Sequence, residues 1–243
     1  MAPADEQAAQ VIDMDSDSRG LSGRGPAAGP TSTGTTAPPP GSVATSFLAV
    51  PQVDDDVQRL YAHDLADHGF VMNLTRVWAH VPQAHDALFG LLAEMVEVAG
   101  LTFRQRGILV AGAARSLGDA YCSLAWGARL AGAAGDDVAE AVLAADDAEL
   151  DDADRALAQW ARAVASDPNA TTAADLEPLR RAGFDDRQIF ALTTFVALRL
   201  AFSTINDALG AQPDRQLVDD APAVVRKGVS WGRAPAERRS ATS

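Results

Sequence analysis

From Val53 to about Gly210, apolar residues recur every three or four positions, and no alternating segment bounded by hairpin turns interrupts them. This spacing is typical of α-helices that bury one face. Helices are expected at about 55–67, 73–80, 82–99, 102–117, 119–130, 137–143 and 186–209, with a helix that ends before Pro168 and a short one after Thr172. The pattern predicts an all-α domain.

Capping residues support several of these boundaries. Gly100 and Gly118 follow two of the apolar runs, where glycine commonly ends a helix. Asp119 is suited to cap the start of the next helix, because its carboxylate can accept unpaired backbone N–H groups. The turn at Gly132–Gly135 then predicts that the helices before and after it form a helical hairpin.

The helix expected at 186–209 is apolar around most of its circumference. A helix of that kind is buried in the centre of a domain or covered at a subunit interface. The sequence therefore predicts a central or interfacial position for it.

Both ends of the chain lack this periodicity. Residues 1–52 are rich in Ser, Gly, Pro, Thr and Ala between Ser16 and Gly41, so they are predicted to form a disordered tail. The helical domain is expected at 53–212, and 213–243 is expected to be a C-terminal extension with one helical turn near Val224. The chain shows neither a signal-peptide pattern nor an uninterrupted apolar run long enough to span a membrane, which predicts a cytoplasmic protein.

The formal charge of −13 argues against nucleic-acid and membrane partners, since both are polyanionic. The single cysteine among 243 residues excludes a disulfide within one chain and a cysteine-rich zinc site. The four histidines lack the spacing of four at which two imidazoles on one helix grip a metal, so no metal site is expected. No nucleotide-binding glycine motif is present either, and no cofactor is expected.

The run from Thr102 to Gly132 contains Gly118-Asp119-Ala120-Tyr121-Cys122-Ser123-Leu124-Ala125-Trp126. This stretch resembles the alkyl hydroperoxide reductase D-like (AhpD-like) and carboxymuconolactone decarboxylase family, whose motif is Cys-x-x-Cys-x-x-x-His with a Glu twelve residues upstream. In that register Cys122 matches the second Cys. Asp119 replaces the first Cys, Trp126 replaces the His, and Gly107 replaces the Glu.

Three flanking passages resemble the peroxidase-related branch of the same family in the expected order: Asn73–Pro82, Asp154–Leu157 and Asn206–Gly210. The resemblance covers about residues 55–210. It implies an all-helical AhpD-like fold built around a helical hairpin, and an assembly of identical chains such as a trimer or hexamer. It also implies peroxidase or decarboxylase chemistry, although a dithiol cycle requires a second cysteine that this chain lacks.

Two opposing effects act on the thiol of Cys122. Its place in the first turn of a helix favours the thiolate, because unpaired N–H groups and the helix dipole stabilise negative charge. Asp119, one turn earlier, raises the thiol pKa by like-charge repulsion. Cys122 is accordingly either a one-thiol nucleophile or a small buried hydrophobic residue.

The other candidate site residues also have two interpretations each. Asp119 is a helix cap or an acid or base in place of the lost Glu, and His80 is a substitute proton carrier or a surface residue near a helix end. Tyr121 and Trp126 are substrate-binding residues or packing aromatics.

Three functions follow from these alternatives. The leading hypothesis is an altered member of the family that reduces peroxides through Cys122. The second is cofactor-free proton transfer on a small acidic or lactone-like substrate, with Asp119 and His80 as acid and base. The third is a non-catalytic helical oligomer or binding module.

Overall fold

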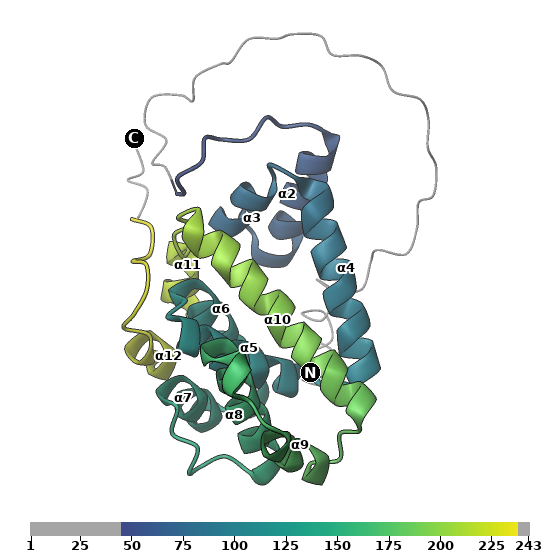
Figure 1. Ribbon diagram of the computed structural model, residues 1–243. Helices are drawn as coiled ribbons and strands as arrows, with labels where there is room; N and C mark the ends of the chain where they lie inside the picture. Colours follow the sequence, from purple (N-terminus) through teal and green to yellow (C-terminus); the bar gives the residue numbers. More distant parts are fainter. Residues whose placement is uncertain (1–44, 238–243) are drawn as a thin grey trace, which may run out of the picture.

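The computed structural model describes residues 45–237, and every regular element within that range is helical (Figure 1). The prediction of an all-α fold is therefore confirmed. Residues 1–44 of the expected N-terminal tail, and residues 238–243, lie outside the described part of the chain.

The elements follow one another as a succession of packed helices. Their bounds are α2 (Asp55–His68), α3 (Asn73–Trp78), α4 (Pro82–Ala99), α5 (Phe103–Leu117), α6 (Ala120–Ala134), α7 (Asp136–Ala144), α8 (Asp152–Ser166), η1 (Pro168–Ala170), η2 (Ala173–Leu176), α9 (Glu177–Arg181), α10 (Asp186–Ala208), α11 (Arg215–Asp220) and α12 (Ala223–Gly228).

The expected caps form at the helix ends. Thr102 and its Gln105 make a reciprocal capping box on α5, and the Asp119 carboxylate accepts from the Cys122 backbone N–H at the start of α6. Gly100 and Gly118 adopt positive φ values of 66° and 70° at the ends of α4 and α5, a conformation that glycine reaches without steric cost. These local signals explain why the expected boundaries agree closely with the observed ones.

Helix α5 is central and packs against α6 on one side and α8 on another. The contact with α6 is close, because a Cβ atom added at Gly107 would lie 3.1 Å from Cδ1 of Leu130. Helices α6 and α7 form the predicted hairpin, and α12 covers it. Helix α10 lies across α4, α5 and α8, beside α4 along much of its length (Figure 1).

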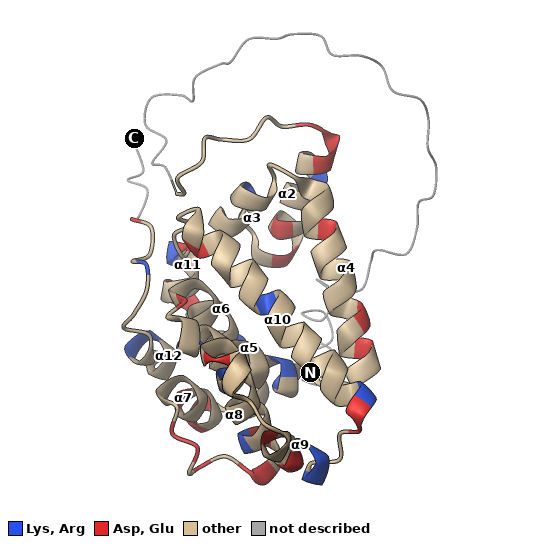
Figure 2. Cartoon of the chain, viewed as in Figure 1, with Lys and Arg blue, Asp and Glu red and all other residues tan. Residues whose placement is uncertain are grey.

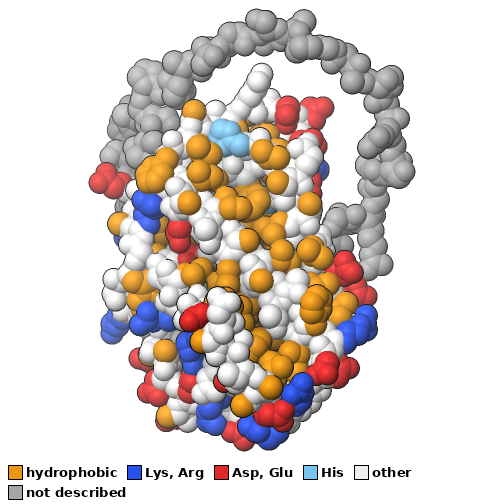
Figure 3. Space-filling view, in the orientation of Figure 1, with side chains coloured by type: hydrophobic (Ala, Val, Ile, Leu, Met, Phe, Trp, Pro, Cys, Tyr) orange, Lys and Arg blue, Asp and Glu red, His pale blue; other side chains and the backbone are white. Residues whose placement is uncertain are grey.

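Helix α10 is long and apolar enough to cross a membrane by length and composition. Its inner face is packed into the protein, since Leu192 and Phe195 are fully buried. Its outer face carries Phe190, which is 69% exposed. Apolar side chains gather over this face of the molecule (Figure 3).

The residues beyond 212 contribute more to the packing than their sequence pattern predicts. The expected turn near Val224 is α12, where Val225 is fully buried, but α11 was not anticipated. The buried carboxylate of Asp214 accepts hydrogen bonds from the Asn73 backbone N–H and from the Tyr121 hydroxyl. This segment thereby joins the start of α3 to α6.

Candidate functional site

A pocket with a cavity volume of about 70 Å³ opens between α4, α5, α6 and α10. Cys122 lines it together with aromatic rings from all four of these helices and arginines from three of them. The aromatic residues in the wall are Phe89, Phe103, Tyr121, Trp126 and Phe202, and the cationic or ionisable ones are His85, Arg106, Arg129 and Arg199. Cys122 therefore faces a cavity rather than a fully packed centre.

The thiol of Cys122 is buried at the start of α6. The hydroxyl of Ser203 donates a hydrogen bond to Sγ over 3.5 Å. Burial raises the pKa of the Cys122 thiol well above its usual value, and the nearby negative charge of Asp119 raises it further, while Ser203 and Arg199 act in the opposite direction. The thiol is consequently neutral at physiological pH.

Asp119 serves as the cap of α6, as one of its two interpretations predicts. Its Oδ1 atom accepts from the Cys122 backbone N–H at 2.9 Å, and the residue is 1% exposed. Asp119 does not line the pocket. Its role near Cys122 is electrostatic, because it places a buried negative charge one turn from the sulfur.

Trp126 occupies the position at which the family motif has a histidine, and its ring lies in the pocket wall. The guanidinium of Arg199 lies 4.8 Å from the centre of this ring, and that of Arg129 lies 5.2 Å from it. Phe103 packs against the same indole, with 5.9 Å between ring centres. Trp126 thus supports two cations where the motif would carry an acid–base group.

Gly107 occupies the position of the family Glu. A Cβ atom there would lie 3.1 Å from Cδ1 of Leu130, so a longer side chain would require Leu130 to shift. The absence of the Glu is therefore part of the close helix packing, and its neighbour Arg106 lines the pocket instead.

His80, the histidine that the sequence singles out, is not brought to the pocket. Its Nε2 atom lies 3.0 Å from the carbonyl oxygen of Ala49, and the contact is exposed. The structure therefore does not bring together His80, Asp119 and Cys122 in one cavity.

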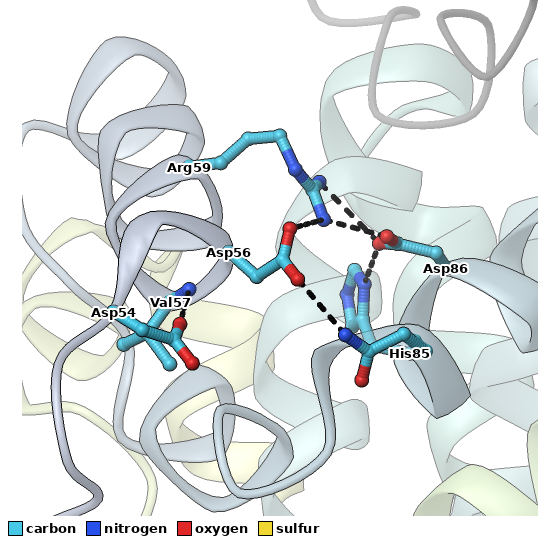
Figure 4. Close-up of polar contacts among 7 residues, drawn as sticks. Asp54, Asp56, Val57, Arg59, His85 and Asp86 are labelled. Atoms are coloured by element: carbon cyan, nitrogen blue, oxygen red, sulfur yellow. Dashed lines mark hydrogen bonds and ion pairs between the residues drawn. The ribbon is translucent and has the colours of Figure 1, made fainter. Parts of the chain in front are cut away.

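His85 takes the place in the pocket that His80 was expected to have. Its ring stacks on Phe89, with 4.3 Å between ring centres, and its Nδ1 atom lies 3.3 Å from Oδ1 of Asp86. Figure 4 shows Arg59 reaching the same carboxylate, at 2.6 Å, from α2. Since an ionised carboxylate only accepts hydrogen bonds, Asp86 favours a proton on Nδ1 and leaves Nε2 as the basic atom.

Burial lowers the pKa of His85, whereas the hydrogen bond to Asp86 raises it. Because burial has the larger effect, the neutral imidazole is favoured near neutral pH. The neutral imidazole is the form of histidine that can accept a proton.

The hydroxyl of Tyr121 forms hydrogen bonds within the protein. It donates to the Asp214 carboxylate and accepts from the Leu74 backbone N–H at 3.3 Å. These hydrogen bonds favour a structural role for the Tyr121 hydroxyl, which links α6 to Asp214 and to the start of α3.

The described part of the chain, residues 45–237, contains no group of three or more His, Cys, Asp or Glu side chains placed to bind a metal ion. Acidic residues lie along the α7–α8 loop and near α9, and others lie on α2 and α4 (Figure 2).

No protein-family model and no curated protein matches the sequence. Solved structures do match the fold. A peroxidase-related protein from Ralstonia eutropha JMP134, described as an alkylhydroperoxidase AhpD core, superposes with a TM-score of 0.63 at 23% identity, covering 80% of this chain and all of that one. The chain has the AhpD-like fold.

Two further structures share this AhpD-like fold. A peroxidase-related protein from Silicibacter sp. TM1040 gives a TM-score of 0.62 at 21% identity, covering 76% of this chain and 97% of that one. The debrominase Bmp8 gives 0.56 at 14% identity, covering 74% and 94%. At these identities the likeness concerns the fold, and the chemistry has to come from this chain's own pocket.

Several residues of this pocket could not be found from the motif. His85, Arg106, Arg129 and Arg199 come from four helices, and no spacing in the sequence relates them. Only Arg106 and Arg129 lie close to motif positions in the sequence. Arg106 directly precedes Gly107, and Arg129 lies one helical turn after Trp126.

Proposed function

We propose that this AhpD-like protein is a one-thiol reductase of small organic hydroperoxides, with Cys122 as the nucleophile and His85 as the proton carrier. The observation that carries the proposal is that Cys122, the one cysteine of the chain, lines a cavity that also contains a histidine. The AhpD-like peroxidase-related structures support it at the level of the fold.

The first step transfers one oxygen atom. His85 accepts the thiol proton, Sγ of Cys122 attacks the peroxide, the O–O bond breaks, and the departing alkoxide takes the proton back from His85. Cys122 becomes a sulfenic acid and the hydroperoxide becomes an alcohol.

Recovery of the thiol requires an external low-molecular-weight thiol, because no second cysteine exists. One equivalent condenses with the sulfenic acid to give a mixed disulfide and water. A second equivalent releases the Cys122 thiol and a disulfide of the external thiol.

The two alternative functions have less support in the geometry. Proton transfer by Asp119 and His80 requires both groups in one cavity, and neither lines this pocket. A non-catalytic helical oligomer or binding module would not need a thiol and a histidine in the same cavity. The debrominase Bmp8 has also been crystallised, as a variant, with 2,3,4-tribromopyrrole, which supports use of this fold for small-ring substrates.

The test is consumption of cumene hydroperoxide in the presence of dithiothreitol. Cys122→Ser should abolish protein-dependent turnover, and His85→Gln should lower it by about a hundredfold, the range of general acid–base catalysis. His80→Gln is the matched control and should leave turnover unchanged, since His80 lies outside the pocket. Undiminished turnover in Cys122→Ser, with wild-type helicity retained, would refute the proposal.

We also propose that the chain assembles with copies of itself. The support is the row of exposed apolar side chains on α4 and α10, which includes Leu91 and Phe190. An exposed apolar surface of this kind is typical of an interaction site.

A further inference from the structure

We infer that Ser203 is a further residue of the reaction centre: its hydroxyl holds the Cys122 sulfur and stabilises the negative charge that the sulfur acquires when its proton leaves. The inference rests on the proposed function in taking Cys122 as the nucleophile. It adds a group from α10 that belongs neither to the motif nor to the pocket wall.

Ser203 reaches the sulfur from inside the protein. Its Oγ atom lies 3.5 Å from Sγ of Cys122, and the residue is only 4% exposed. Phe202, its neighbour on α10, lines the pocket together with Cys122, whereas Ser203 does not. A molecule in the cavity can therefore contact the sulfur without displacing the Ser203 hydroxyl.

Two other hydroxyl groups of α10 bond differently. Thr193 donates to the carbonyl oxygen of Ile189 at 2.6 Å, and Thr194 donates to that of Phe190 at 2.9 Å. Donation to the carbonyl oxygen four residues earlier is common for serine and threonine inside a helix. Ser203 instead donates to a side chain of another helix, so it links α10 to the start of α6 at the reacting atom.

The hydrogen bond from Ser203 gains strength as the reaction proceeds. A neutral thiol is a weak acceptor, whereas a thiolate carries a charge, and hydrogen bonds to charged groups are roughly twice as strong as neutral ones. A donor already placed at the atom on which charge develops stabilises the transition state without having to move. Ser203 therefore favours the charged form of a thiol that burial and Asp119 keep neutral.

The Ser203 hydroxyl acts beside several charged groups. In addition to burial, Asp119 at the start of α6 raises the pKa of Cys122, whereas Ser203 and Arg199 on α10 lower it. The other charged or titratable side chains that line the pocket are His85 on α4, Arg106 on α5 and Arg129 on α6. Since serine is uncharged, its replacement by alanine removes the hydrogen bond and leaves the charges of the site in place.

The experiment measures alkylation of Cys122 by iodoacetamide from pH 6 to 10 in Ser203→Ala. The variant should have about tenfold less thiolate below the thiol pKa, since hydrogen bonds to charged groups exceed neutral ones by about that factor. Nucleophilicity rises with the pKa at a Brønsted slope of about 0.4 to 0.5, so the net alkylation rate should fall about threefold. The rise of the rate with pH should also begin at higher pH than in wild type.

Ser123→Ala is the matched control. Ser123 follows Cys122 in α6 and is fully buried, and within the described residues its Oγ atom has no hydrogen-bond partner. This variant removes the same group without touching the sulfur and should give the wild-type profile. Ser203→Thr keeps the hydroxyl group and should also retain the wild-type alkylation rate.

An unchanged profile in Ser203→Ala, with wild-type helicity, would overturn the inference. So would an equal loss of rate in Ser123→Ala, or a loss in Ser203→Thr as large as that in Ser203→Ala. Because alkylation needs no hydroperoxide, failure of the proposed function is a separate outcome, in which Ser203→Ala shifts the alkylation profile but wild-type protein consumes no cumene hydroperoxide.

Discussion

Replacement of Asp119 by Asn should make the thiol of Cys122 more reactive. Asn caps helices as well as Asp does, so the hydrogen bond to the Cys122 backbone N–H, now 2.9 Å, is retained. What disappears is the buried negative charge that raises the pKa of Cys122. The variant therefore separates the electrostatic effect of Asp119 from its structural one.

The size of the effect follows from Coulomb's law. Two unit charges about 6 Å apart, at an effective dielectric constant of about 20, repel each other by about 3 kcal/mol. Relief of that repulsion raises the thiolate population roughly a hundredfold below the thiol pKa, since about 1.4 kcal/mol corresponds to a factor of ten. Nucleophilicity falls as the pKa falls, with a Brønsted slope of about 0.4 to 0.5, which leaves a net gain of about tenfold.

The assay is the rate of alkylation of Cys122 by iodoacetamide, measured by mass spectrometry from pH 6 to 10. In wild-type protein the rate should still be rising in the alkaline part of this range, because the thiol pKa is raised well above its usual value. In Asp119→Asn the rise should begin at lower pH. Asp185→Asn, the same change at the cap of α10, is the matched control and should react like wild type.

Unchanged alkylation of Asp119→Asn across the pH range would refute this reasoning, provided that its helicity equals that of wild type. It would mean that burial alone controls the thiol. An equal gain in Asp185→Asn would instead point to a global loosening of the protein.

Two further predictions concern stability and assembly. Burial raises the pKa of Asp207 to about 6, and the charge of Asp119 contributes as the next cause. The native state therefore binds this proton more tightly than the unfolded chain does. The protein consequently loses stability as the pH rises through about 6. Asp207→Asn should consequently stabilise the protein more at pH 7 than at pH 5 in urea titrations, and an equal gain at both values would contradict that account. Phe190→Asp should lower the mass measured by light scattering after size-exclusion chromatography, because Phe190 is 69% exposed on the proposed interface of α10; an unchanged oligomeric mass would exclude this surface.

The sequence predicted those features that depend on local signals. The caps at Thr102 and Asp119 and the glycines at 100 and 118 act within a few residues of themselves, and the helices begin and end beside them as expected. The packing of residues beyond 212 was not predicted, because it depends on distant partners, such as the contact between Asp214 and Tyr121. A periodicity of three or four residues contains no information about such a contact.

The site was only half predictable for the same reason. Cys122 and Trp126 share one helix at the spacing of the motif, and both line the pocket. The choice of His80 depended on its passage approaching the motif in space, and α4 instead presents His85, three residues after the start of that helix. The alignment with the motif could not identify the arginines of the pocket, because they replace none of its residues.

The three altered motif positions act together on the chemistry of the pocket. Gly107 allows α5 and α6 to approach closely, Trp126 contacts Arg129 and Arg199, and Asp119 adds to the effect of burial in keeping Cys122 protonated. Because the thiol of Cys122 is neutral, the proposed reaction requires that its proton leave when the substrate is bound, and we propose that His85, which lines the same pocket, accepts it.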